Sequence, residues 1–169
     1  MKKVLLLSIL GVVLVFFACN ASKKIPDMVG ADVSVASKKT KNIILMIGDG
    51  MGLTQITAGM YMNNNKTVFE EFKHIGLLKT YSSDKLVTDS AAGATAYACG
   101  IKTYNGAIGV NPDTTSIQTI LESAEEAGLE TGMVATSVIT HATPASFAAH
   151  QPNRKMYEEI AEDFLDVPM

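Results

Sequence analysis

The sequence has no tryptophan, and aromatic residues of all kinds make up only 7% of its 169 residues. This scarcity argues against an aromatic platform for sugars or single-stranded nucleic acids. Two cysteines are too few for a small fold held together by disulfides. Charged residues make up 18% and the formal net charge is -3, which excludes an acidic disordered tail and a strongly basic nucleic-acid-binding protein. The 47% of hydrophobic residues, by contrast, is enough for the core of about one domain.

The N-terminus has the pattern of an export signal. Two lysines precede an apolar run over 4–18, which is shorter than a comfortable bilayer span. The run ends with Ala18 directly before Cys19, an arrangement that resembles a bacterial lipobox. We therefore expect a lipoprotein-type signal peptide at 1–18 with lipidation of Cys19, or, alternatively, an ordinary cleaved signal peptide. Residues 19–41 are expected to be a flexible tether, and the protein to be exported to the periplasm or anchored at the outer membrane of a bacterium.

Beyond residue 41, apolar runs alternate with helical patterns. The runs predict buried strands at 42–47, 75–81 and 131–136. The helical patterns predict helices at 53–62, at 91–99, from 115 or 116 to about 128, and at about 153–165, with Pro144 suited to a first helical turn. Strands that alternate with helices are typical of an α/β fold with a parallel sheet.

Asp49 lies in a glycine-rich turn directly after the first predicted strand. The glycines at 48, 50 and 52 have GxGxG rather than GxGxxG spacing, and the carboxylate between them would repel a pyrophosphate. An aspartate at the carboxyl end of a buried strand is well placed to bind a metal ion. A local hydrogen bond within the turn is an equally weighted alternative.

Ser90 stands at the start of the small-residue helix, after Thr88 and Asp89. Unpaired amides and the positive end of the helix dipole at this position would stabilise an alkoxide and attract phosphate. The alternative is that Ser90 only caps the helix. Cys99, at the end of the same run, is expected to be a packed core thiol.

Three more side chains suited to ion binding follow the third predicted strand. His141 and Thr143 are two residues apart, so on an extended segment they would offer a nitrogen and a hydroxyl to one ion. Arg154 carries a guanidinium suited to two phosphate oxygens. The alternatives are a hydrogen-bonded surface histidine and a solvated helix start.

Taken together, these segments resemble the alkaline phosphatase family, and they occur in the family's order. The resemblance covers about residues 42–165 and rests on the strand and turn at 42–52, the nucleophile segment at 87–96 that continues to 106, the segment at 141–145, and the pair at 154–155. It implies a three-layer α/β sandwich with a mainly parallel central sheet, incomplete in this chain, with residues 42–169 as the N-terminal part of a catalytic domain. It also implies phosphomonoester hydrolysis through a phosphoserine intermediate.

The resemblance further implies a role for each candidate residue. Ser90 would be the nucleophile, Arg154 would hold two phosphate oxygens, and Asp89 would position Arg154. Asp49 and Ser90 would contact zinc, and Asp49 would bridge to a magnesium site served by His141 and Thr143. Position 141 departs from the enteric bacterial pattern, which has aspartate there, so magnesium could bind differently or zinc could enter.

The family takes its remaining ligands for two zinc ions and one magnesium ion from a later region. Only fifteen residues follow Arg154, and none is histidine. We therefore expect this chain to be a fragment of a longer enzyme, inactive by itself. The full-length enzyme would act on phosphomonoesters, release inorganic phosphate and form a homodimer. The alternative is a non-catalytic or truncated exported lipoprotein that retains half of a metal and phosphate site.

Overall fold

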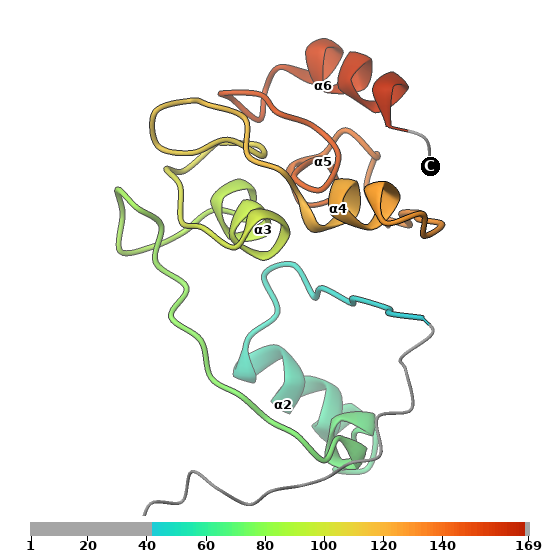
Figure 1. Ribbon diagram of the computed structural model, residues 1–169. Helices are drawn as coiled ribbons and strands as arrows, with labels where there is room; N and C mark the ends of the chain where they lie inside the picture. The colour runs from blue at the N-terminus through green and yellow to red at the C-terminus, as the bar shows by residue number, and fades with distance from the viewer. Residues whose placement is uncertain (1–41, 168–169) are drawn as a thin grey trace, which may run out of the picture. The chain divides into compact units, whose positions relative to one another are not determined.

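The computed structural model describes residues 42–167 (Figure 1). The chain divides into two units, Met1–Leu45 and Met46–Met169, and all the helices in the described part belong to the second unit. In chain order these helices are α2 (Leu53–Met62), the 3₁₀-helix η1 (Val68–Glu71), α3 (Ser90–Cys99), α4 (Ile120–Glu126), α5 (Ala142–Ala145), α6 (Tyr157–Asp163) and the 3₁₀-helix η2 (Phe164–Asp166).

Helix α2 confirms the helix predicted at 53–62. The side chain of Gln55 accepts a hydrogen bond from the backbone N–H of Gly52 at 3.0 Å, which satisfies one amide at the start of the helix. None of the ten residues of α2 is buried. The Gln55 contact therefore caps a helix that has no fully buried face.

Helix α3 confirms the helix predicted at 91–99, with Ser90 as its first residue. The cap is Asp89, whose Oδ1 accepts from the backbone N–H of Ala92 at 2.9 Å. The helix ends at Gly100, which has a φ of 71° and so adopts the left-handed conformation that glycine tolerates best. Because Asp89 caps the helix, the alternative that Ser90 is only its cap is wrong.

Helix α4 begins at Ile120, so the predicted start at residue 115 or 116 is wrong. Thr119 and Glu122 form a reciprocal capping box: the Thr119 N–H donates to Glu122 Oε2 at 2.7 Å, and the Glu122 N–H donates to Thr119 Oγ1 at 3.1 Å. Ser116 instead forms an isolated antiparallel bridge with Val110. The capping box, rather than the apolar periodicity, sets the start of this helix.

The core of this region forms where α3, α5 and α6 meet (Figure 1). Helix α3 packs against α5 and also contacts α4. The small side chains on α3 and α5 let the helix backbones approach closely, and Ile160 of α6 is fully buried. The residues of this core cluster are Ala91, Ile108, Ala142, Ala145, Ala149 and Ile160, with Phe164 packed against them.

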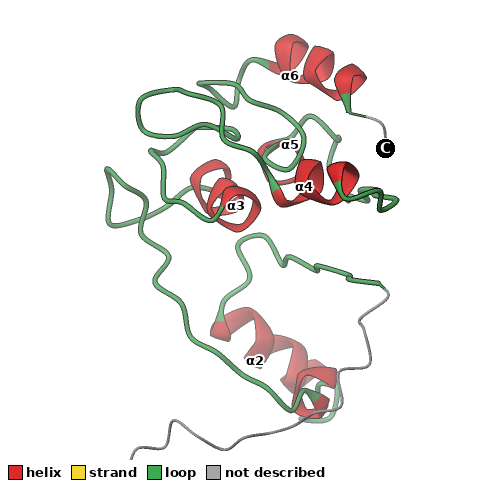
Figure 2. Ribbon diagram, in the orientation of Figure 1, coloured by secondary structure: helices red, strands yellow, loops and turns green. Residues whose placement is uncertain are grey.

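The predicted strands at 42–47, 75–81 and 131–136 are wrong for the described structure, which shows loops there (Figure 2). Between residues 42 and 167, the bridges Ile108↔Gln151 and Val110↔Ser116 are the only β pairings. A strand requires a neighbour for its backbone hydrogen bonds, and no strand in the described part of the chain pairs with these apolar runs. The described residues therefore do not form the predicted parallel sheet or three-layer sandwich.

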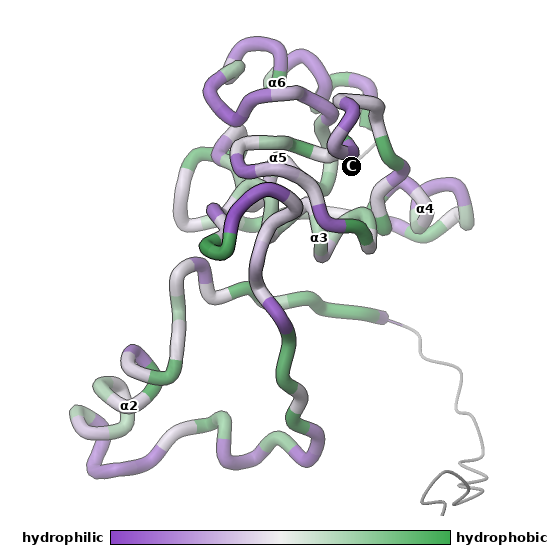
Figure 3. Tube along the Cα trace, turned by 90° about the vertical axis from the view of Figure 1, so that its left-hand side faces the viewer, coloured by the Kyte–Doolittle hydropathy of each residue, from purple (hydrophilic) through white to green (hydrophobic). Residues whose placement is uncertain are grey.

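The apolar runs consequently expose hydrophobic side chains. Leu77 and Val134 are fully exposed, at 101% and 102%, and Ile75 is 87% exposed. Figure 3 shows the apolar stretch that precedes α2 as a continuous hydrophobic segment. Such exposure is unusual for long runs of aliphatic residues in a folded protein.

The predicted signal peptide at 1–18, the lipidation site at Cys19 and the tether at 19–41 lie outside the described residues. Within the part that is described, no helix has both the length and the apolar character needed to cross a membrane.

Candidate active site

The side chain of Arg154 connects the two residues at the start of α3. Its Nη1 donates to Ser90 Oγ at 2.9 Å and to Asp89 Oδ2 at 3.1 Å. These partners lie 64 and 65 residues earlier in the sequence. The side chains of Arg154 and Asp89 are 28% and 27% exposed, so the ion pair remains accessible from solvent. The structure thus brings together three of the residues that the sequence singled out.

Asp89 uses its two carboxylate oxygens for two different purposes. Oδ1 caps α3 through the Ala92 N–H, while Oδ2 accepts from Arg154. The carboxylate therefore holds the guanidinium beside the first residue of a ten-residue helix. At that position the helix dipole and the first amides favour a negative charge or a phosphate group.

A second pair of predicted site residues meets at Asp49 and Thr143. The Thr143 hydroxyl donates to Asp49 Oδ2 at 2.8 Å across 94 residues of sequence. Asp49 is exposed, and the turn that carries it includes Gly50 at a φ of 68°. His141 directly precedes the short helix α5, and its half-buried side chain makes no capping hydrogen bond.

The metal-ligating side chains form pairs rather than a complete site. Over residues 42–167, no three histidine, cysteine, aspartate or glutamate side chains are close enough together to hold an ion. Asp49 and Thr143 supply a carboxylate and a hydroxyl, oxygen donors of the kind that bind magnesium or calcium.

Residues 40–166 of the chain match the family model of the alkaline phosphatases. The chain belongs to the alkaline phosphatase family. It is 42% identical to Alkaline phosphatase 3 of Bacillus subtilis (strain 168), over 98% of this chain and 37% of that protein. It is 45% identical to the alkaline phosphatase of Escherichia coli (strain K12), over 73% of this chain and 28% of that protein.

Solved alkaline phosphatases also resemble this structure. The enzyme from the Antarctic bacterium TAB5 matches with a TM-score of 0.69 and 54% identity, over 72% of this chain and 35% of that chain. The cold-active alkaline phosphatase from Shewanella sp. matches with a TM-score of 0.69 and 42% identity, over 72% of this chain and 32% of that chain. These neighbours are consistent with the predicted α/β class. The chain spans about a third of the length of these relatives.

Magnesium appears in two solved variants of the Antarctic alkaline phosphatase. In these variants a histidine is replaced by aspartate or glutamate, and both are described with Mg bound in the M3 site. Each shows a TM-score of 0.69 and 53% identity to this chain.

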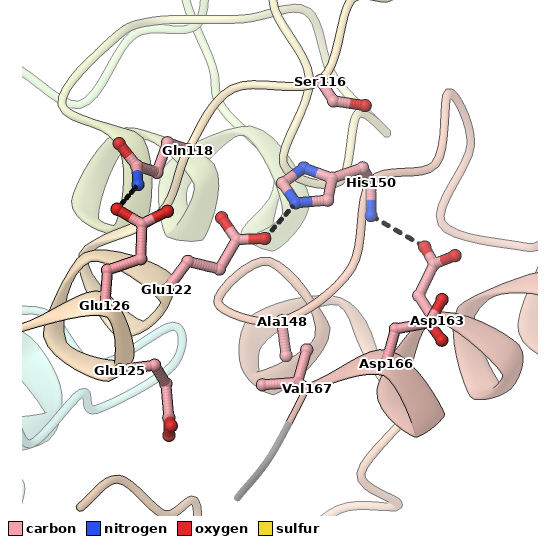
Figure 4. A pocket seen from close by; sticks show the side chains of 10 residues that line it. All are labelled: Ser116, Gln118, Glu122, Glu125, Glu126, Ala148, His150, Asp163, Asp166 and Val167. Carbon is pink, nitrogen blue, oxygen red and sulfur yellow. Dashed lines mark hydrogen bonds and ion pairs between the residues drawn. The ribbon is translucent and has the colours of Figure 1, made fainter. Parts of the chain in front are cut away.

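A pocket in this chain lies around His150 and includes none of the predicted site residues (Figure 4). His150 Nε2 lies 2.7 Å from Glu122 Oε1, and Nδ1 lies 2.7 Å from the carbonyl oxygen of Gly109. Burial lowers the pKa of His150, but hydrogen bonds to Glu122 and Gly109 and the nearby charges of Glu122 and Asp163 outweigh it, so the pKa is raised. The sequence alone gave His150 no role.

Cys99 is the last residue of α3. Cys99 is partly buried, and its thiol contacts the carbonyl oxygen of Ile117 at 3.5 Å. Burial, together with the charge of Glu122, raises the pKa of the Cys99 thiol to about 11, which agrees with a packed and unreactive thiol.

Asn105 contacts the turn before Ser90 through its side chain. The sequence placed it within the family's nucleophile segment but assigned it no role.

Proposed function

We propose that this chain carries the nucleophile and the phosphate clamp of a phosphomonoester hydrolase that works through a phosphoserine at Ser90. The observation that carries the proposal is the contact of Arg154 with both Ser90 Oγ and Asp89 Oδ2. An arginine, a serine at a helix N-terminus and an orienting carboxylate are groups that suit phosphoryl transfer to a serine. Membership of the alkaline phosphatase family supports the same reaction.

The chemistry assigned to these residues is a double displacement. Ser90 Oγ forms a bond to phosphorus while the bond from phosphorus to the ester oxygen breaks, and the alcohol leaves with a proton. Water then attacks the phosphoserine, which releases inorganic phosphate and restores the hydroxyl. Arg154, held by Asp89, donates to two non-bridging oxygens and offsets their charge in both steps.

The residues present fit part of the metal set that the family implies. The Asp49 carboxylate and the Thr143 hydroxyl, 2.8 Å apart, are suitable magnesium ligands, and His141 lies two residues before Thr143. We assign Asp49, His141 and Thr143 to magnesium, and Asp49 with Ser90 to zinc. Bound zinc would lower the pKa of a coordinated hydroxyl and stabilise charge on phosphate oxygens.

The experiment combines acid-quenched phosphoserine labelling with steady-state kinetics on the product of the complete reading frame, supplied with zinc and magnesium. Ser90→Ala should abolish the label. Arg154→Ala should keep the nucleophile but lower kcat/KM about 30- to 1000-fold, because a contact at developing charge is worth roughly 2–4 kcal/mol. It should also weaken inhibition by inorganic phosphate, which uses the same guanidinium.

Two neighbouring variants serve as controls. Ser137, whose hydroxyl donates to the carbonyl of Val138, and Lys155, an exposed residue next to Arg154, lie outside the proposed site. Ser137→Ala and Lys155→Ala should retain both label and activity. Label on a residue other than Ser90, or undiminished phosphate inhibition in Arg154→Ala, would overturn the assignment.

The metal assignment has its own test at position 141. His141→Asp should raise magnesium affinity in the loaded enzyme, because a carboxylate oxygen is a harder ligand than an imidazole nitrogen. The Mg-bound histidine variants of the Antarctic relative support this expectation. Isothermal titration with magnesium gives the measurement, and His74→Asp, at an exposed site remote in sequence, is the control. Equal magnesium affinity in the His141→Asp variant and the wild type would contradict the assignment.

We also propose that these 169 residues alone do not hydrolyse p-nitrophenyl phosphate, because no complete metal site is formed by the residues described. Zinc-dependent turnover by the purified chain, lost in Ser90→Ala, would refute this.

The proposed export and lipid anchoring have a test of their own. Mass spectrometry of the membrane fraction should find a diacylglycerol group on Cys19, and an unmodified N-terminus at another residue would contradict the anchoring.

A further inference from the structure

We propose that Asn105 is a positioning residue for the reaction, because its side-chain amide fixes the backbone turn that presents Asp89 and Ser90. The inference deepens the proposed function and rests on the roles given there to Ser90 and Arg154. It assigns no contact between Asn105 and substrate.

Both halves of the Asn105 amide are used on the same turn. Oδ1 accepts from the backbone N–H of Asp89 at 3.0 Å, and Nδ2 donates to the carbonyl oxygen of Val87 at 3.0 Å. A backbone N–H requires an acceptor and a carbonyl requires a donor, so these two contacts fix which end of the amide is oxygen. The side chain thereby locks the peptide groups on both sides of Thr88.

The orientation of this turn controls the residues that follow it. Asp89 must direct one carboxylate oxygen to the Ala92 N–H and the other to Arg154. Ser90 must present its hydroxyl at the first position of α3, 2.9 Å from the same guanidinium. A rotation of the peptide group before Asp89 would disturb both contacts, and small misplacements at a reacting centre reduce rates strongly.

The residues on either side of Asn105 hold the segment that carries Arg154. The carbonyl of Gly106 accepts from the Arg154 backbone N–H at 2.7 Å, and the Tyr104 hydroxyl donates to the carbonyl of Pro152 at 2.9 Å. Three consecutive residues therefore tie the nucleophile turn to the arginine segment, which are more than sixty residues apart in the chain. Asn105 is the member of this trio that contacts the nucleophile side.

The backbone of Asn105 is held by a separate contact to Asp84. Its backbone N–H donates to Asp84 Oδ1 at 3.1 Å, and the same oxygen accepts from the Ser82 hydroxyl at 2.9 Å. This anchor is independent of the side chain, so replacing the Asn105 side chain should leave the loop in place and remove only the two contacts to the turn.

Asn111 provides a matched control of the same residue type. Its Oδ1 accepts from the backbone N–H groups of Asp113 and Thr115, each at 2.9 Å. It therefore also makes two hydrogen bonds to backbone, but in a turn that holds none of the proposed site residues. A merely structural loss should be similar in Asn105→Ala and Asn111→Ala.

The experiment is amide hydrogen exchange by NMR on the isotopically labelled 169-residue chain. Asn105→Ala should lower the protection factor of the Asp89 amide at least tenfold and shift the resonances of residues 87–92. Asn111→Ala should change neither, even if both variants lower Tm by the same amount. Unchanged Asp89 protection in Asn105→Ala, or the same change in Asn111→Ala, would overturn the inference.

Asn105→Asp adds a readout that a structural role does not predict. The ionised carboxylate can still accept from the Asp89 N–H, but its second oxygen faces the Val87 carbonyl with no proton to donate. Asp89 protection should therefore be reduced at pH 8 and recover toward the wild-type value as the new carboxyl is protonated at low pH. Asn105→Ala should show no such recovery. Absence of recovery in Asn105→Asp would count against the assigned pair of hydrogen bonds.

Titration of the same samples with inorganic phosphate separates this inference from the proposed function. Phosphate should shift the Ser90 and Ala91 amides of the wild type, and Asn105→Ala should bind phosphate about fivefold more weakly, as expected for loss of an ordinary hydrogen bond. A wild-type chain whose amides do not respond to phosphate would count against the proposed phosphate site. The hydrogen-exchange result would still decide the role of Asn105.

Discussion

Two regions of this chain are rich in apolar side chains, but only one of them buries those side chains. Around α3, α5 and α6, Ile108 and Ile160 are fully buried among alanines. In the runs at 75–81 and 131–136, Ile75, Leu77, Leu78 and Val134 are exposed, and no strand among the described residues pairs with the backbone there. Hydrophobic composition alone therefore does not decide where a core forms.

The difference follows from how each region satisfies its backbone. Helices form their hydrogen bonds within one segment, so α3 and α5 need only close side-chain contact to pack. A strand forms its bonds with a neighbour, and a parallel sheet requires several strands at once. Ser90 is the first residue of α3, and the segment that leads to Arg154 pairs with Ile108 through the bridge at Gln151. Both residues therefore belong to the packed region, where they are in contact.

The largest expected effect is on stability in the buried region. Ile160→Ala should lower the free energy of unfolding by about 2–5 kcal/mol, because it leaves a cavity in the core. Ile75→Ala, the same change at an 87% exposed position, should fall within about 0.5 kcal/mol of the wild type. Urea unfolding followed by circular dichroism measures both. Equal losses of unfolding free energy in Ile160→Ala and Ile75→Ala would contradict the difference in burial between the two regions.

A smaller effect is expected at the ion pair that joins α4 to the segment before Arg154. In the folded chain the pKa of His150 is raised above its ordinary value of 6.5, so its contribution is fully present below pH 6.5 and is lost as pH rises through the folded pKa. Burial raises the pKa of Glu122, but hydrogen bonds from His150 and Thr119 and the charge of His150 outweigh it, so the pKa falls below 4.5. The contribution of Glu122 is therefore present above pH 4.5 and is lost as pH falls through its folded pKa.

The pair should consequently stabilise the fold most between about pH 4.5 and pH 6.5. His150→Gln should lower the free energy of unfolding by about 1.5–3 kcal/mol at pH 5.5, the range for hydrogen bonds to charged groups, and by less at pH 9. His74→Gln, at an exposed position, should leave the free energy of unfolding unchanged at both pH values. A His150→Gln effect that is equal at pH 5.5 and pH 9 would show that the charge does not contribute.

The smallest effect is expected in the third apolar run. Val134→Ser should change the free energy of unfolding by less than about 0.5 kcal/mol, because Val134 is fully exposed. A loss above about 2 kcal/mol would mean that this run is buried in solution. The third run would then belong to the buried part of the molecule, inside a packed sheet.

Local sequence signals succeeded where a short segment carries its own stabilising contacts. The helix at 53–62 was predicted with its observed bounds, and the start of α3 was located because Asp89 and Ser90 are typical of a helix N-terminus. The start of α4 was misplaced because the apolar pattern extends before Thr119, whereas the capping box with Glu122 sets the observed boundary. The strands were not formed, because strand pairing depends on partners that periodicity cannot supply.

The sequence by itself determined which residue types the site contains and that the chain resembles one family, since both depend on motifs of a few adjacent residues. The resemblance to the family implied that Asp89 positions Arg154 and that Asp49 and Thr143 serve one magnesium site. The tertiary structure shows the contacts of Arg154 with Ser90 and Asp89 and of Thr143 with Asp49, and it alone revealed that Asn105 holds the turn between Val87 and Asp89. Each of these contacts closes a loop of 16 to 94 residues. Which distant groups meet depends on how helices pack and loops close, and no local pattern in the sequence encodes that choice.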